Sequence, residues 1–153
     1  MQQPENIKAL ILEELNKIIR EKTDLLEQTI KAAKESRDNE TKSSVGDKYE
    51  TGRAMVQMEL EKSQAQLAQT ENLKTSLSRI DPNSRFTSIE FGSLVVTSQG
   101  TYFFSIAHGK IVLDKEVIFC LSPVSPVGKL LAGKKAGDEV QFQGKEIKII
   151  RVE

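Results

Sequence analysis

Two carboxylates lie three positions apart in a short polar stretch of the chain. Asp47 and Glu50 fall within residues 43–53, between two long segments of helical periodicity. Carboxylate oxygens suit Mg²⁺, which often takes one or two protein carboxylates and completes its shell with water and phosphate oxygens. In the first turn of a helix, residues three apart share a face, so both carboxylates could converge on one ion.

The same pair also has a purely structural interpretation. Acidic side chains stabilise the N-terminus of a helix, because its free N–H groups carry partial positive charge. Asp47 could therefore cap the second helix, with Glu50 completing a box-like arrangement three positions later. The residues alone favour capping, and both interpretations stay open.

Tyr49 and Arg53 lie beside the carboxylates. A tyrosine could stack on a nucleotide base, a contact worth ~1 to 3 kcal/mol per base. Arg53, one turn beyond, could contact a phosphate. The alternatives are that Tyr49 is only an exposed residue at the tip that helps to position the hairpin, and that Arg53 is a solvated helix residue.

Two amphipathic segments must position this loop. They run over about 4–37 and 49–80, with apolar residues mostly three or four apart and no proline inside either pattern. Each helix alone would leave an apolar stripe uncovered. They therefore predict an antiparallel coiled-coil hairpin over residues 1–80, with its tip near 38–50.

The second segment has the weaker apolar stripe. Ser63, Thr70 and several glutamines interrupt it. A place in a helical bundle is the alternative to a coiled coil.

The period changes after Asp81-Pro82, where proline ends the helix. Short β-branched and aromatic runs follow, separated by turn signals such as His108-Gly109-Lys110. Expected strands occupy 89–97, 101–107, 116–121, 139–142 and 146–152. A short helix is expected over 126–133, with proline near its start and glycine at its end. The fold class is therefore α+β, with a small antiparallel sheet domain at 85–153.

Charge and composition exclude several classes of protein. The chain has 22 basic and 22 acidic residues, so it lacks a general polyanion-binding footprint. No apolar run is long enough for a signal sequence or a membrane span, which predicts a cytoplasmic protein. Cys120 lies in an apolar run and is expected in the core.

Few residues support independent catalysis. His108 is the lone histidine and falls in a turn, and the ligands for a zinc site are too few. With no tryptophan and few aromatics in the sheet region, an aromatic-lined proline pocket is not expected.

Residues 125–140 follow the pattern S-P-x-G-K-x-L-x-G-K-x-x-G-D-x-V, and Phe91-Gly92-Ser93 precedes them. With a helical hairpin before a small sheet domain, this resembles the bacterial Gre transcript-cleavage factors. The resemblance implies an FK506-binding-protein-like C-terminal domain that docks on RNA polymerase near its secondary channel, which the hairpin enters. Tip carboxylates then help the polymerase hold a second magnesium ion, so that a backtracked RNA 3′ end is hydrolysed.

The same motif suggests where the partner binds. Lys129, Lys134 and Lys135 form a local basic patch that could meet an acidic surface of the polymerase, with Ser125 and Pro126 beside them. A solvated rim around a structural turn is the alternative.

The tip itself departs from the family pattern, Gly-Asp-x-x-Glu-Asn followed later by Tyr. Gly46 to Glu50 match its first five places, but Thr51 stands where Asn is usual and the tyrosine falls inside the motif. A second alignment pairs Ser44 and Tyr49 with the family's Ser and Tyr. It puts Lys42 and Val45 at the acidic positions and implies no cleavage. The first alignment is preferred because it retains both carboxylates.

The resemblance implies a monomeric factor that stimulates the polymerase's own hydrolysis rather than an enzyme alone. It would hold no stable cofactor and share Mg²⁺ with the polymerase. Its partners would be bacterial RNA polymerase and the nascent RNA 3′ end, with no membrane. The alternatives are a non-cleaving regulator of the secondary channel and a coiled-coil adaptor for another protein.

Overall fold

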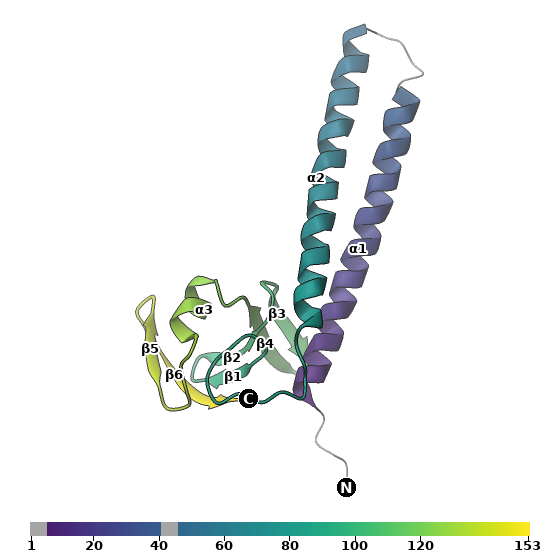
Figure 1. Cartoon of the computed structure of the whole chain (residues 1–153). Coiled ribbons are helices and arrows are strands. Elements are labelled where there is room, and N and C mark those ends of the chain that lie inside the picture. Colours follow the sequence, from purple (N-terminus) through teal and green to yellow (C-terminus); the bar gives the residue numbers. More distant parts are fainter. Residues whose placement is uncertain (1–5, 41–45) are drawn as a thin grey trace. The chain divides into compact units, whose positions relative to one another are not determined.

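The computed structural model describes residues 6–40 and 46–153, excluding the side chains of residues 40 and 46–50. The fold is α+β, with two long helices followed by a six-stranded, mostly antiparallel sheet and a short helix (Figure 1). The chain divides into two compact units. One joins the residues up to Glu14 to Ser76–Glu153, and the other is Leu15–Thr75.

The long helices are α1, Ile7–Glu40, and α2, Gly46–Ser78. At 1.5 Å per residue each is about 50 Å long. The side chain of Asn6 caps α1, since its Oδ1 accepts the Ala9 N–H at 3.2 Å. The prediction of two helices is confirmed. Among the residues that the structure describes, no helix has the length and apolar content needed to cross a membrane.

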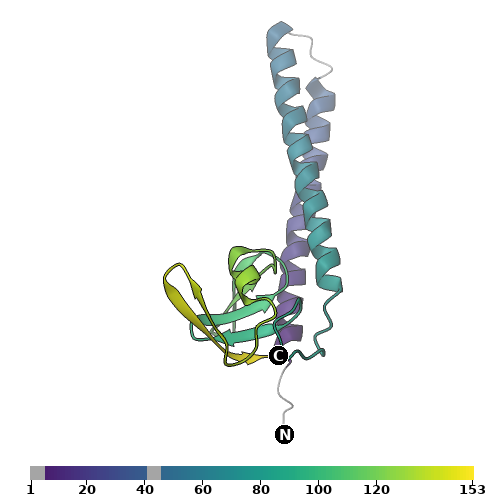
Figure 2. The ribbon, with the colours of Figure 1, turned by 60° about the vertical axis from the view of Figure 1, so that its left-hand side comes forward.

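Within the unit Leu15–Thr75 the two helices run side by side (Figures 1 and 2). Their buried residues are three, four or seven positions apart, a spacing typical of a heptad seam. These residues are Leu15, Ile19, Leu26, Ala33, Leu60, Ser63 and Thr70. Ser63 and Thr70, expected to interrupt the stripe, are thus part of the buried face.

Replacing Thr70 with valine is expected to stabilise this unit by about 0.5–1 kcal/mol. The Thr70 hydroxyl is buried and donates to the Gln66 carbonyl of its own helix at 2.8 Å. Removing this hydroxyl therefore leaves no other group without a hydrogen-bond partner. Urea denaturation would measure the change, with Thr75→Val as control, because Thr75 makes the same bond to Glu71 at 3.1 Å on an exposed face. A loss of stability at Thr70 beyond that at Thr75 would contradict the expectation.

The six strands of the sheet lie in the order β3-β4-β2-β1-β6-β5. Their bounds are β1 Leu94–Thr97, β2 Gly100–Phe104, β3 Gly109–Leu113, β4 Glu116–Leu121, β5 Glu139–Phe142 and β6 Lys145–Val152. Four of the five neighbouring pairs are antiparallel, and β2 with β4 is parallel.

The sheet differs from the sequence prediction at three points. β1 begins at Leu94 rather than Ile89, β3 was not predicted, and the β2–β4 pair departs from the expected antiparallel arrangement. Gly109 has φ +101° and was read as a turn residue, yet it begins β3. Because β3 takes the edge, β4 returns between β3 and β2 and runs parallel to β2.

The short helix α3, Pro126–Leu131, covers one face of the sheet (Figures 1 and 2). The core between α3 and the sheet consists of Ile89, Val95, Phe104, Leu131 of α3 itself, Ile147 and Ile149. Alternate residues of the central strands, including Phe103 and Ile118, are buried on the other face. Cys120 is buried as predicted, and burial raises the pKa of its thiol to about 12, so it is inert at neutral pH.

Candidate functional site

The first candidate site is the start of α2. This helix begins at Gly46, so Asp47 and Glu50 are its second and fifth residues, and residues three apart share a face of a helix. The side chains of Asp47, Tyr49 and Glu50 lie outside the described residues. Arg53, one turn further along α2, is exposed.

Among the side chains that the structure describes, no group of three or more His, Cys, Asp or Glu could hold a metal ion.

The second candidate site is the motif at 125–140, and the structure gives many of its residues a backbone task. Ser125 is the N-cap of α3: its Oγ accepts the Gly128 N–H at 3.1 Å and donates to the Ser122 carbonyl at 2.7 Å. Pro126 occupies the first turn, where its missing N–H costs nothing. Both residues thus specify the start of α3, whatever else they contact.

The segment after α3 is tied to the strand region by backbone hydrogen bonds. Gly133 has φ +77°, and its N–H donates to the Ile89 carbonyl at 2.8 Å. The Ile89 N–H donates in return to the Lys134 carbonyl at 2.8 Å. Asp138 closes the next turn by accepting the Lys135 N–H at 2.8 Å. Much of the motif therefore encodes a folded loop.

Gly128→Ala is expected to destabilise the sheet unit by about 1–3 kcal/mol. A Cβ at this position would collide with the carbonyl oxygen of Ser122 and lie 2.8 Å from the Ser125 Oγ. The collision is with backbone and with the cap of α3, so no flexible side chain can relieve it. Thermal unfolding would measure the effect.

The matched control is Ala132→Gly. Ala132 is the exposed C-cap of α3. This change therefore also exchanges alanine and glycine at α3, but it adds no atoms and causes no collision. Equal stability of Gly128→Ala and the wild type would contradict the close packing at Gly128.

Three lysines of the motif have side chains that make no contact described for α3 or its loop. Lys129, Lys134 and Lys135 are all exposed. Lys129 is in the last turn of α3, where its positive charge interacts favourably with the negative end of the helix dipole. The structure thus separates the motif into residues that build α3 and its loop and lysines that present positive charge to solvent.

A cavity that the sequence did not predict lies on the sheet. Its volume is about 270 Å³, and its lining is Gln99, Tyr102, Phe119, Phe142, Gln143, Lys145 and Ile147. The rings of Tyr102 and Phe119 lie with centroids 5.8 Å apart, because the parallel β2–β4 register pairs these residues. Phe142 of β5 is the third aromatic residue of the lining. The expectation that the sheet region lacks an aromatic-lined proline pocket stays a prediction, because the lining does not show what the cavity binds.

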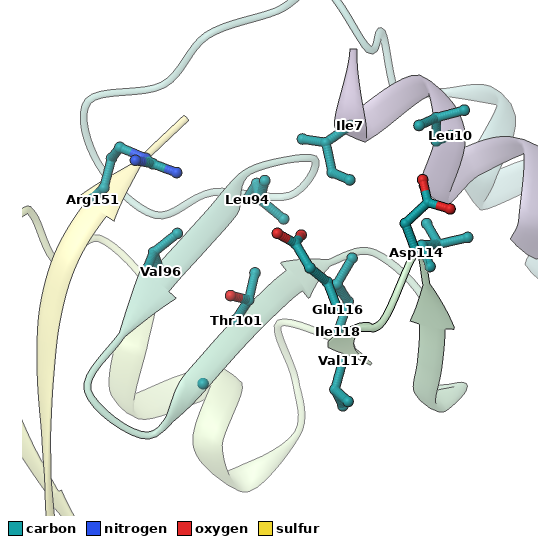
Figure 3. Close-up of a pocket in the computed structure, with 12 residues that line it drawn as sticks. Ile7, Leu10, Leu94, Val96, Thr101, Asp114, Glu116, Val117, Ile118 and Arg151 are labelled. Carbon is teal, nitrogen blue, oxygen red and sulfur yellow. The ribbon is translucent and has the colours of Figure 1, made fainter. Parts of the chain in front are cut away.

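A larger cavity, of about 630 Å³, lies between the start of α1 and the sheet, within one compact unit (Figure 3). Its apolar lining includes Ile7, Leu10, Leu94, Val96 and Ile118. The charged groups at its edge are Asp114, Glu116 and Arg151, and Arg151 is paired with Glu153 at 2.9 Å. This arrangement could hold an apolar group.

Lys8 is a buried cation that the sequence also did not reveal. Its Nζ donates to the Ser84 carbonyl at 2.8 Å and lies 4.9 Å from the centre of the Phe86 ring. Burial lowers the pKa of Lys8, and nearby Glu153 partly opposes that shift. These contacts fasten the start of α1 to residues 84–86, which is a structural role.

The chain was compared with known proteins. A scan against models of protein families found no match. A search of curated proteins likewise found no match.

Proposed function

We propose that this protein is a Gre-like transcription elongation factor that binds bacterial RNA polymerase. In this proposal α1 and α2 form an antiparallel coiled coil that enters the secondary channel, and the sheet unit is FK506-binding-protein-like and docks at the channel mouth. The observation that carries the proposal is the start of α2 at Gly46. It puts Asp47 and Glu50 in one helical turn at the junction of two helices about 50 Å long.

The chemistry of the proposal is metal-assisted hydrolysis of RNA. Two-metal phosphodiester hydrolysis uses one ion to activate water and another to stabilise the leaving oxygen. Asp47 and Glu50 supply hard oxygen ligands for the second Mg²⁺, whose other ligands come from the polymerase, water and RNA phosphate. The protein is then no enzyme by itself and holds no metal stably. In this proposal Tyr49 and Arg53 contact the RNA 3′ end.

The docking surface in this proposal is the exposed face of α3 and the loop after it. Lys129, Lys134 and Lys135 present positive charge there, because all three residues are exposed. Ser125 and Pro126 set the direction of α3 and thereby of Lys129. An acidic surface on the polymerase is the complementary partner.

Replacing Lys129, Lys134 and Lys135 together with glutamate is expected to weaken polymerase binding by about tenfold to 100-fold, because like charges then face each other. Thermal stability should stay near that of the wild type, since all three side chains are exposed. Fluorescence anisotropy of labelled protein against polymerase measures the affinity.

The control for this triple variant changes three exposed lysines of the sheet unit outside the motif, Lys110, Lys115 and Lys145, to glutamate. Both variants change the net charge equally. Equal weakening by both would show a general charge effect and contradict the assigned docking surface.

Two other functions have support in particular residues. The off-pattern tip, with Thr51 in place of Asn, favours a regulator that occupies the channel without stimulating cleavage. Leu25, Met55 and Met58 are more than half exposed on the long helices, which favours an adaptor whose hairpin binds another protein.

One assay separates the three functions. Bacterial RNA polymerase is stalled in a backtracked state on a DNA template, and release of the RNA 3′ fragment is followed with magnesium and the full chain. A cleavage factor accelerates release. A channel regulator binds and slows nucleotide addition without accelerating release. An adaptor neither binds the polymerase nor changes either rate, and that result would contradict the proposal.

A further inference from the structure

The aromatic-lined cavity lies on a face of the sheet that α3 covers only in part. α3 is six residues long, about 9 Å at 1.5 Å per residue, and none of its residues lines the cavity. Tyr102 and Phe142 pack against the core that α3 covers, but both stay only partly buried. The cavity is therefore the uncovered end of that core, and its lining lies wholly within the sheet unit.

The backbone holds the rings of the lining in place. The parallel register sets Tyr102 beside Phe119, with ring centroids 5.8 Å apart and ring planes at 39°. The Phe119 ring also lies against Gly100, where an added Cβ would be 3.5 Å from it. Aromatic rings favour tilted or offset neighbours with centroids about 4.5–7 Å apart, so a further planar ring can pack against this surface in the same way.

The charged residue of the lining is Lys145. It lies opposite Phe142 in the β5–β6 ladder, so the two residues share the cavity face of the hairpin. Glu146, the next residue along β6, points to the other face and hydrogen-bonds with Glu139 there. Among the residues that the structure describes, Lys145 makes no ion pair, so its charge is available to a ligand.

Tyr102 supplies a second polar group. Its hydroxyl makes no hydrogen bond to any residue in the described part of the chain. Burial raises the pKa of Tyr102, so the phenol stays protonated at neutral pH and can donate. One cationic and one neutral donor in the same cavity are complementary to a carboxylate, which accepts charge-assisted hydrogen bonds.

The size of the cavity limits the ligand. A cavity of about 150 Å³ holds benzene, whereas pockets for drug-sized ligands begin at about 300 Å³. At about 270 Å³ the cavity has room for one aromatic ring with a short polar arm. That size favours a small free acid over the end of a protein chain.

We infer that this cavity binds a small aromatic carboxylate. The ring packs against Tyr102, Phe119 and Phe142, and the carboxylate accepts hydrogen bonds from the Lys145 ammonium and the Tyr102 hydroxyl. The inference is independent of the proposed function, because the lining includes neither the carboxylates of α2 nor the lysines of the motif at 125–140.

Titration of the ¹⁵N-labelled full chain with phenylacetate, followed by NMR chemical shifts, tests the inference. We expect saturable shifts of the amides of Gln99, Gln143 and Lys145, with a Kd on the order of 1 mM for so small a ligand. Phenylacetamide keeps the ring but lacks the charge, and cyclohexylacetate keeps the charge but lacks the aromatic plane. Each is expected to bind about threefold or more weakly than phenylacetate.

Two substitutions assign the polar contacts. Lys145→Gln is expected to weaken phenylacetate binding by about two- to fivefold and to leave phenylacetamide binding unchanged, because only the acid uses the charge. Tyr102→Phe is expected to weaken phenylacetate binding by about threefold or more. The matched control is Lys148→Gln, which removes an exposed lysine from the other face of β6 and should leave the affinity unchanged.

Several results would overturn the inference. One is the absence of saturable shifts of the cavity amides at tens of millimolar phenylacetate. Others are equal binding of phenylacetamide or cyclohexylacetate, and an effect of Lys148→Gln equal to that of Lys145→Gln. Tighter binding of N-acetylphenylalanine, which mimics the aromatic end of a protein chain, would contradict the assignment to a free acid.

Discussion

Asp47→Asn combined with Glu50→Gln is expected to lower stimulated transcript cleavage by on the order of 100-fold, with polymerase binding unchanged. The amides keep the size of the side chains but remove the negative charge that draws Mg²⁺. A metal ion contributes several kcal/mol to such a reaction, and each 1.36 kcal/mol is about tenfold in rate. Single-turnover release of the RNA 3′ fragment gives the rate, and anisotropy gives the affinity.

This pair of substitutions also separates the metal role from stabilisation of the helix N-terminus. Because α2 begins at Gly46, Asp47 lies inside the helix rather than at its N-cap, so loss of its charge removes only about 0.3–1 kcal/mol of dipole interaction and the start of α2 should persist. Glu59→Gln, which neutralises an exposed carboxylate further along the same helix, is the matched control. Full stimulation by the double variant would contradict the metal role and leave Asp47 and Glu50 as acidic residues that stabilise the N-terminus of α2.

Phe104→Ala is expected to cost the sheet unit about 3–5 kcal/mol. Phe104 is fully buried in the core beneath α3. Its backbone also accepts the Gly92 N–H at 2.6 Å and donates to the Ser93 carbonyl at 3.0 Å, so the strand cannot easily move to fill the space. A domain is usually stable by only ~5–15 kcal/mol, so a large part of that stability would be lost.

Urea denaturation followed by the near-ultraviolet signal of the sheet aromatics measures this change. Val112→Ala is the control. Val112 is exposed on the edge strand β3, so this substitution should lower the free energy of unfolding by under about 0.5 kcal/mol. A cost at Phe104 equal to the cost at Val112 would contradict the assignment of the core.

The long helices were predictable because their apolar periodicity extends over about thirty residues with no internal proline. Their buried polar members were not. Ser63 and Thr70 break the apolar pattern, yet they occupy seam positions, and Thr70 satisfies its hydroxyl within its own helix. A pattern based on residue polarity cannot identify a polar residue that is buried because its position falls on the buried face of the helix.

The sheet was predictable in content but not in order. β3 begins at a glycine of positive φ, which on its own indicates a turn. The parallel β2–β4 pair depends on β3 taking the edge, a property of the whole sheet. The aromatic-lined cavity follows from that register, so Tyr102 and Phe119 could not be paired from the sequence.

The candidate sites were predictable to different degrees. The motif at 125–140 was recognised, but its division into fold-building residues and exposed lysines required the hydrogen bonds of Ser125 and the packing of Gly128. Asp47 and Glu50 are the second and fifth residues of α2, so their backbones lie on one face of the helix. Their side chains lie outside the described residues, so their metal role stays a prediction.

The most direct measurement is a magnesium titration of transcript cleavage by a backtracked polymerase. The titration is run with no factor, with the wild type and with the Asp47→Asn, Glu50→Gln variant. If the carboxylates help to hold the second ion, the wild type lowers the half-saturating magnesium concentration by about tenfold or more, and the variant does not. An identical magnesium dependence for wild type and variant would contradict the account.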